Sequence, residues 1–116
     1  MRRVPMRTAP PVDRTHEPGY KAWHAPVFGR CAVCDHPGRL ERHHILHEQH
    51  VPDEARVWDL ANSLLLGVHC RCHSRHTNAA ERLPASAITP GNLAFMVELL
   101  GEDQAADYVV RYYRAA

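Results

Sequence analysis

Cysteine spacing is the feature that most restricts how this 116-residue chain folds. Cys31 and Cys34 form a CxxC pair, and Cys70 and Cys72 form a second close pair further along the chain. Two thiolates at this spacing grip one tetrahedral ion from a tight turn, and disulfides are rare in reducing compartments. We therefore predict a structural zinc ion that joins the two pairs. Such an ion would add folding energy that the modest core of a short chain lacks.

The second cysteine pair leaves the fourth zinc ligand open between two residues. The run His69-Cys70-Arg71-Cys72 allows His69 to pair with Cys72 at the usual spacing. A set of four cysteines instead uses Cys70 with Cys72, in a tighter loop. Four cysteines are slightly favoured because thiolates hold structural zinc well, and His69 stays the alternative.

Composition and charge exclude some classes of protein. The formal net charge is only +1, which is weak evidence for nucleic acid by itself. No apolar run has the length of a membrane span, so no membrane partner is expected. The basic N-terminus lacks the apolar stretch of a secretory signal. We therefore expect a cytoplasmic protein, and a disulfide-stabilised secreted domain is the least favoured of three hypotheses.

The pattern along the chain predicts an α+β protein in three parts. Residues 1–23 are rich in proline and are expected to form a flexible arm, residues 24–84 the central module, and residues 85–116 a helical extension packed on it. The central module has a turn-rich knuckle, two short strands and a helix, expected at residues 27–39, 40–46, 62–68 and 73–83, with one or two helical turns in 51–58. The extension has two helices, expected at residues 93–100, with Asn92 as N-cap and Gly101 as stop, and at 103–114.

Histidines are concentrated between the cysteine pairs and just after the second pair. Seven of the ten lie from His43 to His76. The order of CxxC, His43-His44-Ile45, the Asn62 of "WDLAN" and the "CHSRHT" run at Cys72 resembles the HNH endonuclease family, and most of all small HNH proteins of phages and their GC-rich hosts. The resemblance covers about half of the chain, from Cys31 to about residue 83.

The resemblance implies a ββα-metal module, two strands and a helix around one divalent ion, and it implies roles for particular residues. His43 matches a metal ligand, and His44 matches the general base. Asn62 matches the asparagine that holds the intervening loop, and His73 matches a ligand at the start of the helix. The last ligand of the family lies at the position of Thr77, and His76 is the proposed substitute.

The chemistry of these residue types agrees with the implied roles. A neutral imidazole can take a proton from water at physiological pH, and a divalent ion can stabilise the leaving oxygen of a phosphodiester. The catalytic ion is expected to be Mg²⁺, Mn²⁺, Ni²⁺ or Zn²⁺. Arginines near the motif are candidate contacts to DNA phosphates, namely Arg42, Arg71 and Arg75.

The resulting hypothesis is a metal-dependent endonuclease that nicks or cuts duplex DNA. The family resemblance suggests a phage setting, with packaging (terminase) proteins as partners. A non-catalytic zinc module that binds DNA or a protein is the alternative, favoured by the threonine at position 77. Other histidines, including His47 and His50, are expected to face solvent, and the aromatic residues Trp23, Trp58, Tyr108 and Tyr112 are expected in the core.

Overall fold

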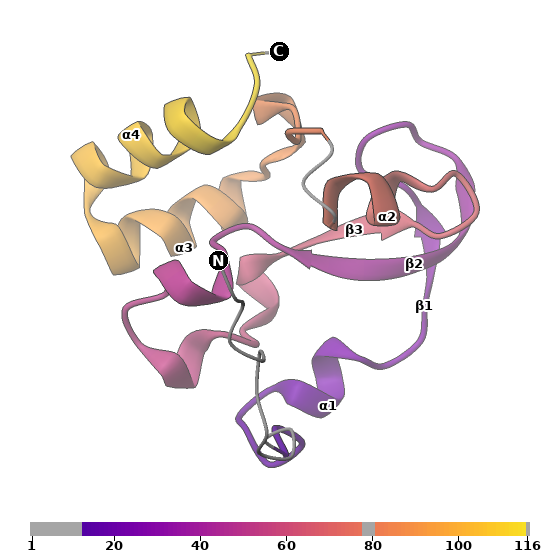
Figure 1. Cartoon of the computed structure of the whole chain (residues 1–116), viewed down its shortest axis with the longest axis horizontal. Helices are drawn as coiled ribbons and strands as arrows, with labels where there is room; N and C mark the ends of the chain where they lie inside the picture. The colour runs from indigo at the N-terminus through magenta and orange to yellow at the C-terminus, as the bar shows by residue number, and fades with distance from the viewer. Residues whose placement is uncertain (1–12, 78–80, 116) are drawn as a thin grey trace, which may run out of the picture.

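A three-stranded antiparallel sheet in the order β1-β2-β3 forms one side of the molecule (Figure 1). The computed structural model describes residues 13–77 and 81–115. Within these residues no helix is both long and apolar enough to cross a bilayer. The regular elements are α1 (Tyr20–Trp23), β1 (Val27–Arg30), β2 (Pro37–His44), β3 (Ser63–Gly67), α2 (Cys72–Thr77), α3 (Pro90–Leu100) and α4 (Glu102–Tyr112), with 3₁₀ turns at Glu48–His50, Glu54–Arg56, Leu60–Asn62 and Ala85–Ala87.

The expected α+β class is confirmed, with one more strand than the sequence predicts. Strand β1 pairs with the first half of β2, so that Val27 lies opposite Leu40. The sequence predicts only a turn-rich knuckle for residues 27–39, which is wrong for both ends of that range. Glycine and proline mark the turn, but they also occur inside the paired strands, where pairing with β2 decides the conformation.

Helix α2 is shorter than predicted. It begins at Cys72 and ends at Thr77, residues 78–80 lie outside the described part, and residues 81–83 are not helical. After the described end of α2, the backbone bonds to the C-terminus: the Ala85 N–H donates to the Arg114 carbonyl, and the Arg114 N–H donates to the Leu83 carbonyl. These contacts to the C-terminus replace the helical pattern that the sequence favours.

Two antiparallel helices, α3 and α4, form the C-terminal layer. The N-cap of α3 is Thr89 and not Asn92, which is a correction to the sequence-based prediction. Thr89 accepts a hydrogen bond from the Asn92 backbone, and the Asn92 side chain accepts one from Thr89 in return. Pro90 at the first helical position begins the helix three residues earlier than predicted. Gly101, with φ of 85°, ends α3 as predicted.

Two buried side chains attach this layer to the central module. The Asn92 amide donates hydrogen bonds to the carbonyls of Ala61 (2.7 Å) and Ser63 (3.1 Å), at the start of β3. The Tyr113 hydroxyl donates to the carbonyl of Ile45 at 2.6 Å, just after β2. The C-terminal helices are therefore hydrogen-bonded to both ends of the segment that connects β2 to β3.

The N-terminal arm is predicted to extend to residue 23, but its second half is folded onto the module. Arg14 contacts Glu48 at 2.6 Å, and the Trp58 indole donates to Glu17 at 3.0 Å. Trp23 is only 5% exposed and belongs to the core. Burial of this indole stabilises the folded position of the segment more than its proline-rich composition favours a flexible chain. The flexible-arm prediction is therefore wrong for residues 13–23. Residues 1–12 lie outside the described part.

The contacts of Asn92 predict how strongly α3 and α4 stabilise the module. Asn92→Ala removes the two donated bonds and the capping acceptor, and should lower the free energy of unfolding by about 2 kcal/mol. Val110→Ala, at an exposed position of α4, should change it by less than about 0.5 kcal/mol. Urea denaturation of both variants measures the difference, and equal stabilities would contradict the assigned role of Asn92.

Candidate functional site

Four cysteine sulfurs meet beside the sheet. The Sγ atoms of Cys31, Cys34, Cys70 and Cys72 all lie within 4.8 Å of one another, and those of Cys34 and Cys72 are 3.7 Å apart. Sulfurs in tetrahedral zinc sites are separated by about 3.8 Å, since each bond is about 2.3 Å long. The cluster therefore fits a structural metal ion such as zinc. His69 is exposed and outside this cluster, so the structure selects the four-cysteine set over the alternative.

Backbone geometry around the cluster explains why the thiols can meet. A Cβ atom on Gly67 would collide with the Sγ of Cys70, so glycine is required where β3 passes the cluster. Burial alone raises the pKa of Cys31, but hydrogen bonds from the backbone of Cys34, Gly67 and Val33 outweigh it and lower that pKa to about 7. Backbone donors thus favour the thiolate, which is the form that binds metal.

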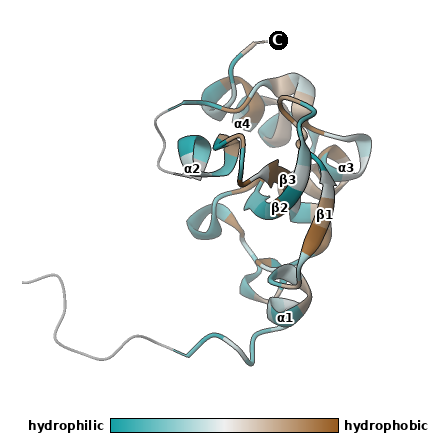
Figure 2. Cartoon of the chain, turned by 90° about the vertical axis from the view of Figure 1, so that its right-hand side faces the viewer, coloured by the Kyte–Doolittle hydropathy of each residue, from teal (hydrophilic) through white to brown (hydrophobic). Residues whose placement is uncertain are grey.

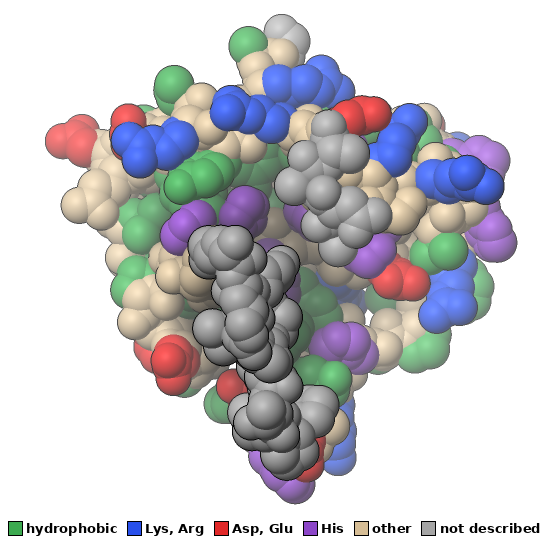
Figure 3. Space-filling model, in the orientation of Figure 1, with side chains coloured by type: hydrophobic (Ala, Val, Ile, Leu, Met, Phe, Trp, Pro, Cys, Tyr) green, Lys and Arg blue, Asp and Glu red, His purple; other side chains and the backbone are tan. Residues whose placement is uncertain are grey.

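A cavity of about 710 Å³ is lined by residues of β2 and α2. All four histidines with predicted roles line it, and histidine side chains surround the hollow in the middle of this face (Figure 3). The remaining histidines in its wall are His24 and His47. The fold therefore brings the predicted residues to one cavity, from two elements far apart in the sequence.

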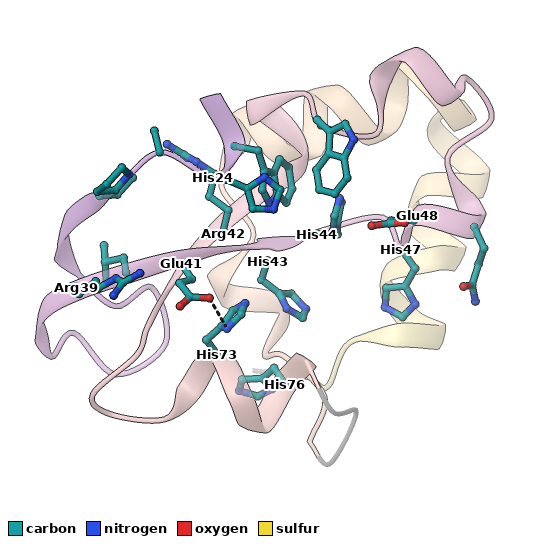
Figure 4. Close-up of a pocket in the computed structure, with 17 residues that line it drawn as sticks. His24, Arg39, Glu41, Arg42, His43, His44, His47, Glu48, His73 and His76 are labelled. Atoms are coloured by element: carbon teal, nitrogen blue, oxygen red, sulfur yellow. Dashed lines mark ion pairs between the residues drawn. The ribbon is translucent and has the colours of Figure 1, made fainter. Parts of the chain in front are cut away.

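Successive residues His43 and His44 point to opposite sides of β2, as strand geometry requires. His43 is directed toward His73 and His76 of α2, and His44 lies on the other side of the strand (Figure 4). Both still line the same cavity, because β2 ends at His44 and the cavity extends around that end. Adjacent histidines can thus take different roles in one site.

The two histidines of α2 are each oriented through Nδ1. The Nδ1 of His76 lies 2.9 Å from the carbonyl of Glu81, so Nδ1 carries the proton and Nε2 presents a lone pair. The His76 side chain is only 6% exposed, and its Nε2 has no hydrogen-bond partner among the described residues. His73 lies with Nδ1 3.3 Å from a carboxylate oxygen of Glu41. An oxygen acceptor behind each ring is the usual support of a metal-ligating histidine.

The imidazoles are neighbours without forming a closed ligand set. The rings of His43 and His73 are centred 6.2 Å apart and nearly perpendicular. Among groups of three or more His, Cys, Asp or Glu side chains within the described residues, only the four cysteines have ligand atoms close enough to share one ion. The donor chemistry and the orphaned Nε2 of His76 fit a transition metal, whereas the present side-chain positions are more open than a bound site.

His44 lies in an aromatic enclosure. Its ring is stacked on Trp23, with centroids 4.1 Å apart, and Trp58 lies 5.2 Å away on a tilted plane. The Val57 backbone hydrogen-bonds to His44, and its Nε2 is buried without a hydrogen bond to any described group. Burial, the largest influence, lowers the pKa of His44 to about 4 against the opposing effect of Glu48. His44 is therefore a neutral imidazole with one unoccupied nitrogen at pH 7.

His43 is shifted in the same direction by a related cause. Burial is again the largest influence, and the neighbouring His73 adds to it, so that the pKa of His43 falls to about 4. A like charge nearby and loss of water both disfavour the protonated form. His43 is thus also neutral at pH 7, as a metal-ligating imidazole must be.

Asn62 closes the loop between β2 and β3. Its side-chain oxygen accepts from the Leu46 backbone at 2.8 Å, and its amide donates to the carbonyls of Leu46 (3.2 Å) and Val57 (3.4 Å). The side chain is fully buried. Because Val57 also hydrogen-bonds to His44, Asn62 holds the segment that orients this imidazole.

The three predicted phosphate contacts differ in position. Arg42 lines the cavity, and its Nε is buried without a hydrogen-bond partner in the described structure. Arg71 and Arg75 are exposed and outside the cavity wall, and Arg75 donates to the Sγ of Cys72 at 3.4 Å. Arg75 therefore supports the thiol cluster, since a cation stabilises thiolates. Of these three arginines, only Arg42 borders the cavity.

Sequence reasoning missed Glu41 and mistook the surroundings of one histidine, His50. Glu41 shares a face of β2 with His43, and the two-residue period of a strand is the signal that would have indicated it. His47 is exposed as predicted, although it borders the cavity. His50 does not simply face solvent, because its Nδ1 lies 2.9 Å from the Tyr108 hydroxyl. The predicted core positions of Trp23, Trp58 and Tyr108 are confirmed, and Tyr112 is half-buried.

Comparison with models of known families, with curated proteins and with solved structures finds no match to this chain.

The thiol cluster predicts the metal content of the protein. One zinc ion per chain should be retained after gel filtration, and Cys70→Ala should lose it, because three thiolates hold zinc less tightly than four. His69→Ala is the matched control, and it should keep the zinc. Metal analysis by mass spectrometry measures both, and loss of zinc from His69→Ala but not from Cys70→Ala would exclude the four-cysteine assignment.

The lowered pKa of His44 predicts a pH-dependent stability. Its folded pKa of about 4 lies below the ordinary value of 6.5, so its contribution is complete above pH 6.5 and is lost as pH falls toward 4. The free energy of unfolding of the wild type should fall between pH 7 and pH 5. For His44→Gln this fall should be smaller by about 1 kcal/mol, a figure that allows for the partial exposure of the His44 side chain. Urea denaturation at both pH values with added zinc measures this, and parallel losses would contradict it.

Proposed function

We propose that this protein is a metal-dependent endonuclease that hydrolyses phosphodiester bonds of DNA, with the resemblance to HNH enzymes indicating the type of mechanism. The observation that carries the proposal is the cavity lined by His43, His44, His73 and His76, in which one nitrogen of His44 and one of His76 are buried without a partner in the described part of the chain. Buried polar atoms without partners are rare in native structures and mark positions where a ligand binds.

His44 is the proposed general base. It is neutral at pH 7, its buried Nε2 has no hydrogen-bond partner among the described residues, and its ring is held by Trp23 on one face and by the Val57 backbone. Asn62 maintains this arrangement by tying Val57 and Leu46 together. A base whose orientation is fixed before substrate binds loses little rotational freedom in the reaction. In this proposal the proton acceptor is His44, on the side of β2 that faces Trp23 and Trp58.

His43, His73 and His76 are the proposed holders of a divalent ion on the opposite side of the strand. Glu41 and the Glu81 carbonyl orient the two α2 imidazoles through Nδ1. When bound, such an ion supplies charge stabilisation for the phosphate and the leaving oxygen. Arg42, with its unpartnered Nε, is placed to bind a non-bridging phosphate oxygen.

Plasmid nicking tests this proposal. Protein with zinc in its thiol site, assayed with added Mg²⁺, Mn²⁺, Ni²⁺ or Zn²⁺, should nick supercoiled plasmid, and His44→Ala should be at least about 100-fold slower, since a general base contributes that much or more. His16→Ala removes a histidine that is 91% exposed and should act like the wild type. Zinc content and circular dichroism should be unchanged in both. Undiminished nicking by His44→Ala would remove this mechanism.

The alternative function is a zinc-binding module that holds DNA or a protein without catalysis. The observation in its favour is that the cysteines form a closed ligand set in the described structure and the histidines do not. The same assay separates the two functions, because binding of DNA without cleavage under any of the four ions would support the module and exclude the enzyme.

A further inference from the structure

Phe28 is an aromatic side chain in an unusual position. It lies in the edge strand β1 and is 74% exposed, whereas the other large aromatic residues near the cavity are buried. The apolar stretch of β1 lies at the outer edge of the sheet in Figure 2. A large apolar side chain held in water by a regular strand contributes little to folding, and its ring is accessible for stacking with a planar ligand.

The register of the sheet places Phe28 on the same face as the metal-site residues. Phe28 pairs directly with Arg39 of β2, and directly opposed residues project to one face. Along β2, Arg39 shares this face with Glu41 and His43, because side chains alternate with a period of two. The exposed phenyl ring therefore lies on the side of the sheet that carries α2 and the histidines.

Arg39 gives this surface the charge that a nucleic acid requires. It is exposed, and it forms no ion pair with any acidic group of the described residues, in contrast to Arg14 and Arg56. Glu41, the nearest acidic side chain on its face of β2, is engaged by His73. Arg30, which follows Phe28 on the same face, is partly compensated by Asp35 at 3.6 Å. An unpaired guanidinium next to an exposed ring matches a phosphate next to a base.

The surface is continuous with the cavity. Arg39 belongs to the cavity wall, and Phe28, its direct partner in the sheet, lies beside it outside the wall. Arg39 lies four residues from His43 along β2, about 13 Å in an extended strand. A DNA strand with a phosphate beside His43 would therefore pass over Arg39 and reach Phe28 with a nucleotide further along the strand.

We propose that Phe28 and Arg39 form a docking surface for an unpaired nucleotide of the DNA strand held in the cavity, with the base stacked on Phe28 and its phosphate bound by Arg39. This inference rests on the proposed function, because it takes DNA as the occupant of the cavity. Stacking on an aromatic ring is tolerant of base identity, so the surface adds affinity for single strands without sequence preference.

Equilibrium binding without added divalent ion tests the surface apart from cleavage. Fluorescence anisotropy with a labelled mixed-sequence 15-nucleotide strand should show about 10-fold weaker binding by Phe28→Ala. Phe28→Trp should keep the wild-type affinity, because indole stacks at least as well. Val110→Ala, at a position that is 78% exposed on α4, is the matched control and should bind as the wild type does. Arg39→Gln should weaken binding and reduce the slope of log affinity against log salt by about 0.7.

Each outcome has a definite meaning. A matching duplex should lose less than threefold in affinity with Phe28→Ala, because its bases are already stacked. Wild-type affinity of Phe28→Ala for the single strand, or the absence of DNA binding by the wild type, would overturn the docking surface. If binding depends on Phe28 but the protein does not cleave DNA with any of the tested ions, the docking surface stands and the proposed enzyme is overturned. If the wild type cleaves DNA and Phe28→Ala does not change binding, the proposed enzyme stands and the docking surface is overturned.

Discussion

The four-cysteine cluster is the contact on which the histidine cavity depends. It joins the turn that contains Cys31 and Cys34, ahead of β2, to the segment that begins α2 at Cys72. A six-residue helix is too short to be stable alone, so its position relative to β2 depends on this junction and on packing against the sheet. His73 follows the cluster directly, and it faces His43 for that reason. A metal ion bound to the thiols would therefore help to hold His73 opposite His43.

Oxygen acceptors decide which nitrogen each histidine presents. Glu41 and the Glu81 carbonyl contact Nδ1 of His73 and His76, and the Val57 backbone contacts His44. All of these partners come from segments other than the residue's own turn or strand. The cavity is therefore specified by its supporting groups as much as by the histidines.

The two sides of β2 provide different environments to adjacent residues. His44 is enclosed by Trp23 and Trp58, and Trp23 belongs to the segment predicted as a flexible arm. His43 faces the polar surroundings of α2. A single strand thus separates the proposed proton acceptor from the proposed metal ligands, and it carries Arg39 toward the exposed Phe28 at the edge of the sheet. The proposed path of DNA follows the same strand.

The sequence by itself determined the chemistry and much of the local structure. Its cysteine pairs predicted a metal cluster, its apolar runs predicted β2, β3 and the C-terminal helices to within a few residues, and Gly101 predicted the end of α3, because these signals are local. Only the tertiary structure decided that Cys70 and not His69 joins the cluster, that Thr89 and not Asn92 caps α3, and that Trp23 is buried against His44. It also revealed β1 and the pairing of Glu41 with His73. These outcomes depend on which segments meet in space, and backbone hydrogen bonds and burial between distant residues outweigh the local preferences that a sequence displays.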